Sequence, residues 1–148
     1  MMPSAYLSDV VKLVKVADAA GAATSTVTSD VVDMANAEGV LFFTSFATPA
    51  ANNTLKVQQS ADSGGSPDDY SDVAGSSVGV GASDEDVYID VKNPGKRFLK
   101  VLALRGTSTA CGDVWAVVYG LRSTTQALNT ISGTQAGEQT SGPAEGTA

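Results

Sequence analysis

The 148-residue chain has the length of one domain, or of one domain with a tail, and a domain of this size can bury enough surface to fold alone. Its net charge of −7 and its lack of lysine- or arginine-rich runs exclude nucleic acid and anionic membrane surfaces as expected partners, because both are bound through cationic side chains. There is no histidine, which removes histidine-based nucleophile systems, metal sites and proton shuttles, so we expect no enzyme and no cofactor.

The first predicted elements are strands. Residues 10–16 fit both the spacing of a helical stripe and that of a strand, but four valines crowd these seven positions. Because β-branched side chains favour strands, we predict a strand that the Ala-Ala-Gly of residues 19–21 breaks. The threonine-rich residues 24–28 predict a second, half-exposed strand.

The strongest predicted strand covers residues 40–46. Both of its faces carry large apolar side chains, so we expect neither face to be wet, which places it in the middle of a sandwich or under a partner. Residues 55–59 alternate between apolar and polar and predict the next strand. Residues 60–72 are rich in Ser, Asp, Gly and Pro and predict a polar loop.

The remaining strands are predicted between residues 73 and 121. Residues 73–80 form a weak, glycine-laced strand, and residues 87–91 have period two with their valines and isoleucine inward. The Asn-Pro-Gly of residues 93–95 predicts a turn. Residues 96–105 and 113–121 predict two long strands, which we expect to be antiparallel neighbours because their connection is short.

About eight short strands, regular turn signals and no long helix predict an all-β fold, a sandwich or a barrel, over residues 10–122. Trp115 shares one face of its predicted strand with Val117 and Tyr119, while the intervening residues share the other. We interpret this alternation as one face in the core and one partly covered face. A sugar-binding platform built on Trp115 and Tyr119 is the alternative.

Two terminal segments are predicted to be arms. Residues 123–148 have too few large apolar residues to fold alone, so they form either a disordered tail or an arm that orders on a neighbouring subunit. Fully extended, these 26 residues reach on the order of 85 Å. Residues 1–9 form the shorter N-terminal arm. The candidate partner-contact residues of the two arms are Tyr6, Leu7, Leu128 and Ile131.

The residues that could act in catalysis or bind a metal ion have simpler, structural explanations. Cys111 cannot form an internal disulfide and has no base nearby in the sequence, so we expect a structural thiol that is at least partly buried. Acidic residues gather at residues 68–69 and 84–86, where a calcium site is conceivable. Neither stretch has the alternating Asp-x-Asp-x-Asp-Gly pattern of a dedicated calcium loop, and we interpret both as plain acidic turns.

Several short phrases, taken in order, resemble small proteins of tailed bacteriophages that are encoded near the major capsid protein. The resemblance spans about residues 10 to 123 and does not include the C-terminal tail. Its phrases are residues 11–18 (VKLVKVAD), 32–35 (VDMA), 39–43 (GVLFF), 55–62 (LKVQQSAD), 69–75 (DYSDVAG), 89–91 (IDV), 94–99 (PGKRFL), 105–107 (RGT) and 119–123 (YGLRS).

Some of the proteins that the chain resembles are capsid decoration, or cement, proteins. The resemblance implies an antiparallel, jelly-roll-like β-sandwich that is made in the host cytoplasm and sits on the outer capsid surface of the virion. The implied partners are the major capsid protein and the chain itself, as a homodimer rather than a homotrimer. A head-fibre or receptor-binding module, of the kind that recognises carbohydrate, is the alternative.

Overall fold

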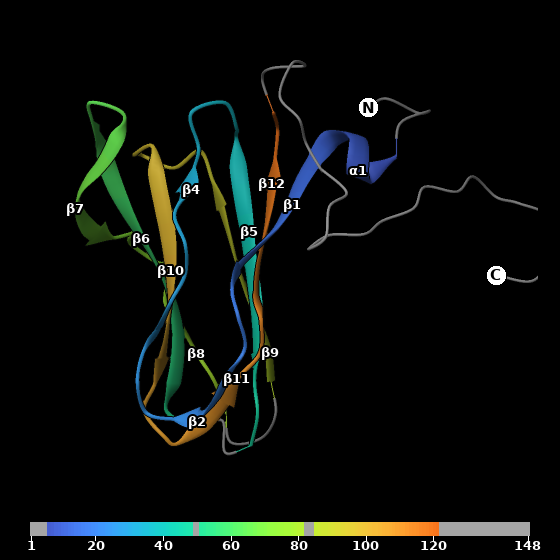
Figure 1. Cartoon of the computed structure of the whole chain (residues 1–148), viewed down its shortest axis with the longest axis vertical. Helices are drawn as coiled ribbons and strands as arrows, with labels where there is room; N and C mark the ends of the chain where they lie inside the picture. Colours follow the sequence, from blue (N-terminus) through green and yellow to red (C-terminus); the bar gives the residue numbers. More distant parts are fainter. Residues whose placement is uncertain (1–5, 49–50, 82–84, 122–148) are drawn as a thin grey trace, which may run out of the picture.

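The computed structural model describes residues 6–48, 51–81 and 85–121, and in these ranges the chain forms two antiparallel β-sheets packed face to face (Figure 1). Sheet A consists of β1 (Val11–Ala17), β2 (Ala20–Ala23), β5 (Gly39–Phe46), β9 (Glu85–Lys92), β11 (Thr109–Cys111) and β12 (Val114–Tyr119). Sheet B consists of β3 (Val27–Thr28), β4 (Val32–Asp33), β6 (Asn53–Ser63), β7 (Ser66–Asp72), β8 (Val78–Gly79) and β10 (Phe98–Arg105). A single helical turn, α1 (Leu7–Val10), precedes β1.

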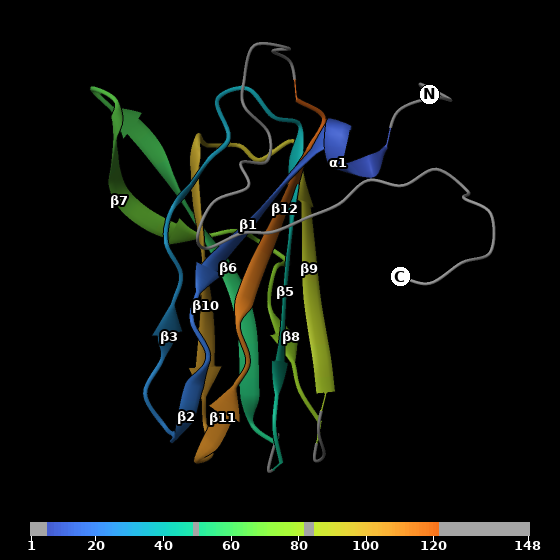
Figure 2. The same cartoon turned by 45° about the vertical axis from the view of Figure 1, so that its right-hand side comes forward.

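The strand order is that of a jelly roll. In sheet A, β1, β12, β5 and β9 lie side by side, as Figure 2 shows. In sheet B, β10 lies between β6 and the short strands β3 and β4, and β7 and β8 both pair with β6. The first strands therefore pair with the last strands, and β5 and β6 also pair with strands that follow them and precede the last ones. This is the pairing of one long hairpin that is wound into two sheets. If β3 is counted with β4, β7 is counted with β8, and the short strands β2 and β11 at the bend are set aside, eight strand positions remain, which confirms the predicted antiparallel, jelly-roll-like sandwich.

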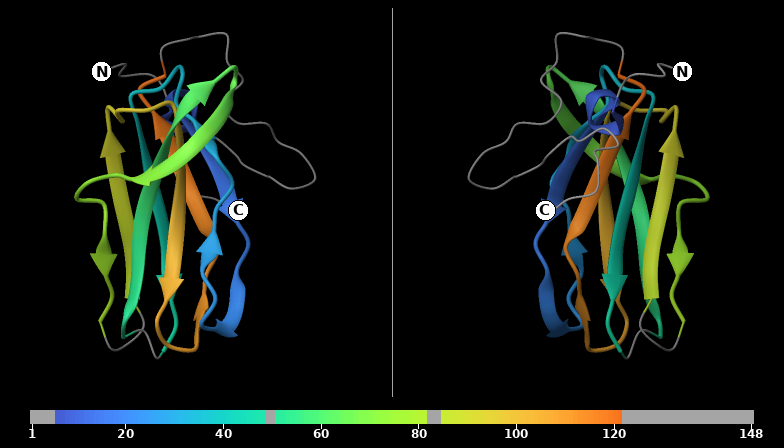
Figure 3. Two further views of the ribbon diagram at one scale, coloured as in Figure 1. Left: turned by 90° about the vertical axis from the view of Figure 1, so that its left-hand side faces the viewer. Right: turned by 90° about the vertical axis from the view of Figure 1, so that its right-hand side faces the viewer.

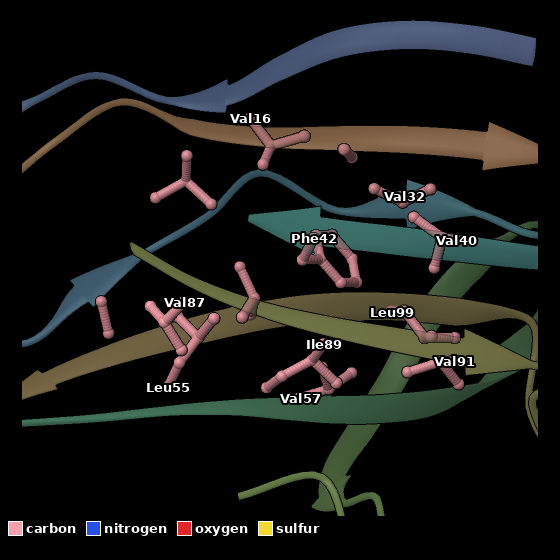
Figure 4. Close-up of a cluster of buried hydrophobic side chains, with 14 of the residues drawn as sticks. Val16, Val32, Val40, Phe42, Leu55, Val57, Val87, Ile89, Val91 and Leu99 are labelled. Carbon is pink, nitrogen blue, oxygen red and sulfur yellow. The ribbon is translucent and has the colours of Figure 1, made fainter. Parts of the chain in front are cut away.

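The core lies between the two sheets and is built by the period-two alternation of their strands (Figure 4). Sheet A contributes Val40 and Phe42, which are fully buried, and the inward residues of β9, among them Ile89. Sheet B contributes Leu55 and Leu99, also fully buried. The remaining members of the cluster are mostly valines, which pack well on a pleated surface.

The prediction of a polar loop over residues 60–72 is wrong. Strand β6 runs to Ser63, and β7 pairs with it antiparallel to form a hairpin that leans away from the rest of the sandwich (Figures 1 and 2). Its turn contains Gly64 and Gly65, both with positive φ, and the Gly65 amide donates to Asp62 Oδ1 over 2.7 Å. The polar side chains reflect solvent exposure of an edge hairpin, because the far end of this hairpin packs on no second layer.

One further expectation is corrected. The long strands β10 and β12 are not neighbours: β10 belongs to sheet B and β12 to sheet A, because the short strand β11 carries the chain from one sheet to the other. The first predicted strand does end before the Ala-Ala-Gly stretch, because β1 stops at Ala17, and a new short strand, β2, begins at Ala20 and pairs with β11. Strand β2 enters the bend between the sheets together with β11.

Candidate partner-binding face

The outer surface of sheet A carries several large apolar side chains that the core does not use, among them Leu13, Phe43 and Tyr88. Figure 3 (right) shows the four strands of this surface, β1, β12, β5 and β9, facing the viewer. Their registers align the outward residues in rows across the sheet. One row contains Leu13, Val117, Leu41 and Asp90 in order from β1 to β9. The next row contains Lys15, Trp115, Phe43 and Tyr88.

The second of these rows is aromatic and partly open to solvent. Phe43 is 37% exposed and Tyr88 is 67% exposed, while Trp115 is half-buried between its neighbours. The strand at residues 40–46 thus buries its inward face in the sandwich, and its partly open outward face stays with the second predicted alternative, cover by a partner. Exposed aromatic side chains at adjacent positions of a rigid sheet are typical of protein interfaces, in which Trp, Tyr and Phe are enriched.

A hollow of about 440 Å³ lies along this aromatic row. We call it the aromatic groove; its lining residues are Phe43, Thr44, Ser45, Asp86, Val87, Tyr88, Asp113 and Trp115. The rings supply apolar walls, and two carboxylates, Asp86 and Asp113, supply its charge. The groove is thus both apolar and acidic.

Sheet B faces the viewer in Figure 3 (left). Its outer surface is different, because its polar side chains are paired with one another. Lys56 Nζ donates to Asp72 Oδ2 over 3.0 Å, and the Gln58 amide donates to the other oxygen of the same carboxylate over 2.9 Å. Lys100 Nζ lies 3.8 Å from the centre of the Tyr70 ring. A surface with paired polar groups is stable in water as it stands, so of the two outer faces the aromatic one is the better candidate for a partner.

Tyr119 lies on the same face as Trp115 but is held by its own contacts. Its ring lies over Gly39, where any side chain would collide with it, and its hydroxyl donates to Asp90 Oδ1 over 2.6 Å. Burial, together with the hydrogen bond to Asp90, raises the pKa of Tyr119 to about 12. The structure therefore places Trp115 with Phe43 and Tyr88 instead of with Tyr119, and the platform expected from the sequence is made of different residues.

The candidate contact residues of the arms are only partly described. Leu7 is 72% exposed on α1, and Tyr6 is half-buried just before it. The Tyr6 amide donates to Asp9 Oδ2 over 3.1 Å, which caps the N-terminus of the single helical turn. Leu128 and Ile131 lie outside the described residues.

A second hollow, of about 370 Å³, lies at the edge of the sandwich where β1 parts from the segment that contains β4. Its walls are the inward residues Val14 and Val16 and the apolar Val32, and its rim carries Lys12 and Asp30. These charges have opposite signs, and the walls belong to the core or pack against it. This hollow is an incompletely closed edge of the core, with no feature that selects a ligand.

The remaining polar groups with altered acidity have structural surroundings. Cys111 is buried, as predicted, with Thr44 Oγ1 3.6 Å from its sulfur, and burial raises the pKa of the thiol. Arg97 pairs with Asp33 and Asp62 and thereby ties the β6–β7 hairpin to β4; its hydrogen bonds lower the pKa of Asp33. In the ranges that the structure describes, no three His, Cys, Asp or Glu side chains are grouped to hold a metal ion.

The fold and the surface define the structural class of this protein as a jelly-roll β-sandwich with one apolar outer face. In comparisons with known proteins, no family model and no curated protein matches the sequence. The resemblance to phage decoration proteins therefore stays a prediction. The helical turn α1 is too short to cross a membrane, and no other helix occurs in the described part of the chain.

Proposed function

We propose that this protein is a structural virion component that binds the outer surface of an assembled phage capsid and stabilises it by bridging neighbouring capsomers. The main support for this proposal is the outer face of sheet A, because it offers exposed aromatic side chains on a rigid sheet. The phrases that resemble small proteins of tailed bacteriophages, some of them decoration proteins, support it, as does the low charged share of 17%, against about 25% in typical domains. A weakly charged surface suits broad contact with protein.

The proposed mechanism is a linked equilibrium and needs no catalysis. A protein that binds the assembled shell but not its separated subunits stabilises the shell by mass action. The stabilisation grows with occupancy, so many copies on repeated capsid positions act together. The proposed partners are the major capsid protein, through the aromatic face, and a second copy of the chain, as a homodimer.

The direct test uses phage particles that lack this protein. Adding the purified protein back is expected to restore resistance to heat or osmotic shock, measured by the release of packaged DNA. The Tyr88→Ala variant should bind such particles about tenfold more weakly, the loss typical of an aromatic interface residue. Val78→Ala, which alters an exposed apolar residue on sheet B, is the control and should bind like the unaltered protein. Particles whose stability is indifferent to the protein would refute the proposal.

The tail gives a separate prediction. Deleting residues 123–148 should leave the domain folded, because the core cluster lies entirely within residues 16–118, yet should weaken binding to particles. Circular dichroism checks the fold, and co-sedimentation with particles measures the affinity. Equal affinity of the truncated and full-length proteins would mean that the tail is a passive appendage and that the body alone makes the contact.

A receptor- or carbohydrate-binding module of the phage particle is the second candidate. One observation favours it: the rings of Trp115, Phe43 and Tyr88 lie in one row with carboxylates beside them, and such a row can stack on a flat ligand. Copy number on the virion separates the two functions. Hundreds of copies per particle favour the cement function, whereas a few tens at unique vertices favour a fibre or receptor-binding module.

A further inference from the structure

We infer that the aromatic groove binds a cationic side chain, arginine or lysine, presented by the protein partner of this face. The inference rests on the proposed function, since it specifies the chemistry of the partner at the same surface. It follows from two properties of the groove that are independent of each other: an uncompensated negative charge and a row of three aromatic rings.

The charge around the groove is negative after its internal pairs are counted. Lys15 is the one cation beside it among the described residues, and its Nζ lies 2.7 Å from Asp18 but 3.9 Å from Asp113. Asp113 also accepts the Ala19 amide over 2.8 Å, which fixes that carboxylate in place. Asp86 is exposed and has no ion pair within the described residues. One lysine among three aspartates leaves two negative charges in excess.

The rings provide the second attraction for a cation. Trp115, Phe43 and Tyr88 occupy paired positions on three adjacent strands. The chain has nine aromatic residues, one Trp, four Tyr and four Phe, so a third of them lie in this row. A guanidinium or ammonium group over such ring faces gains cation–π attraction, and carboxylates at the end of the row add a direct counter-charge.

Other occupants fit less well. A neutral sugar could stack on the rings but would leave the excess negative charge uncompensated. A second copy of this chain carries the same net charge of −7 and would bring two acidic grooves together. A partner with a basic segment removes the excess charge and covers the rings at once, which is why charge complementarity favours it.

The experiment uses the full-length protein and its single tryptophan, which lies in the groove and reports on it directly. The protein is titrated at low salt with the peptide acetyl-Gly-Gly-Arg-Gly-Gly-amide while the Trp115 fluorescence and indole N–H resonance are followed. The control peptide carries citrulline, which keeps the shape of arginine but has no charge. We expect the arginine peptide alone to shift both signals, and added salt to weaken the effect.

Two variants with the same charge change locate the site. Asp86→Asn should weaken arginine-peptide binding about three- to tenfold, whereas Asp68→Asn, on the exposed edge strand β7, should leave it unchanged. Tyr88→Ala should abolish the shift; this residue is too exposed to be needed for folding, which circular dichroism verifies.

Three outcomes would overturn the inference: an equal response to the citrulline peptide, a response to a neutral oligosaccharide but not to arginine, or a tryptophan shift that depends on protein concentration alone. The last would indicate self-association through this face. Binding to phage particles is measured separately, so particles bound normally by a protein that ignores the arginine peptide would refute the inference and leave the proposed function standing.

Discussion

Replacing Phe42 with alanine is expected to lower the free energy of unfolding by about 3–5 kcal/mol, the range for truncating a buried aromatic side chain. Phe42 is fully buried in the middle of β5, with Ala116 of β12 and Ile89 of β9 beside it in the register. Strands on both sides and sheet B opposite prevent the surroundings from closing over the void. Urea unfolding followed by circular dichroism measures the loss.

The matched control is Phe43→Ala, the same change one residue along the same strand. Phe43 points to the outer face and is 37% exposed, so its truncation opens no cavity in the core and should cost less than about 1 kcal/mol. The contrast tests the alternation of β5 directly. Similar losses at the two positions, or a loss below about 1 kcal/mol for Phe42→Ala, would mean that the strand is oriented differently.

Strands that bury one face were predictable from the sequence. In residues 87–91 the expected inward residues Val87, Ile89 and Val91 are all buried, and Tyr88 is exposed as expected. In β12, Val114 and its alternate neighbours face the core. The pattern suffices here because burial of one face imposes period two on the side chains, whatever the partner strands are.

The β6–β7 hairpin was not predictable in this way, for a physical reason. Both faces of its far end, from residue 61 onward, meet water, so neither needs apolar side chains there, and the polar composition indicates a loop. Its order comes instead from backbone pairing, to which the partly exposed ion pair between Arg97 and Asp62 adds only a weak tie. Pro67 and the two aspartates that follow it are suited to an edge strand, because they discourage pairing with another chain.

The pairing of strands that are far apart in the sequence is the second feature that the sequence did not predict. In a jelly roll the chain crosses repeatedly between sheets, so a short connection does not make neighbours of β10 and β12. The aromatic groove could not be predicted for the same reason, because it depends on which strands pair and in which register. Trp115 and Tyr88 each occupy an outward position that alternation indicates, but only the registers of β12 and β9 on β5 bring them to the two sides of Phe43.

Arg105 is a residue whose importance no local pattern indicates, and its replacement by methionine is expected to cost about 2–4 kcal/mol of unfolding free energy. The side chain is 6% exposed at the end of β10. Its guanidinium donates to the carbonyl oxygens of Gly21, Ser25 and Thr109 over 2.6, 2.7 and 2.9 Å. One side chain thus joins three segments at the bend where the chain passes between the sheets.

Methionine keeps an unbranched apolar chain in place of the aliphatic stem of arginine but lacks the guanidinium and donates nothing. Each carbonyl left without a donor costs about 1–3 kcal/mol if it stays buried, and water reaching the partly exposed ones offsets some of the total. Arg105→Lys should be intermediate, because a single ammonium group lacks the planar fork that reaches several acceptors. Urea unfolding of the unaltered protein, Arg105→Lys and Arg105→Met measures their order of stability directly.

Arg97→Met is the control, because it removes an arginine whose contacts are exposed ion pairs with Asp33 and Asp62. Such pairs contribute little in water, so this variant should be far more stable than Arg105→Met. Equal stability of the two variants would mean that water replaces the Arg105 guanidinium at no cost. The bend would then be held by the pairing of β11 with β2 and β5, and the donor would be dispensable.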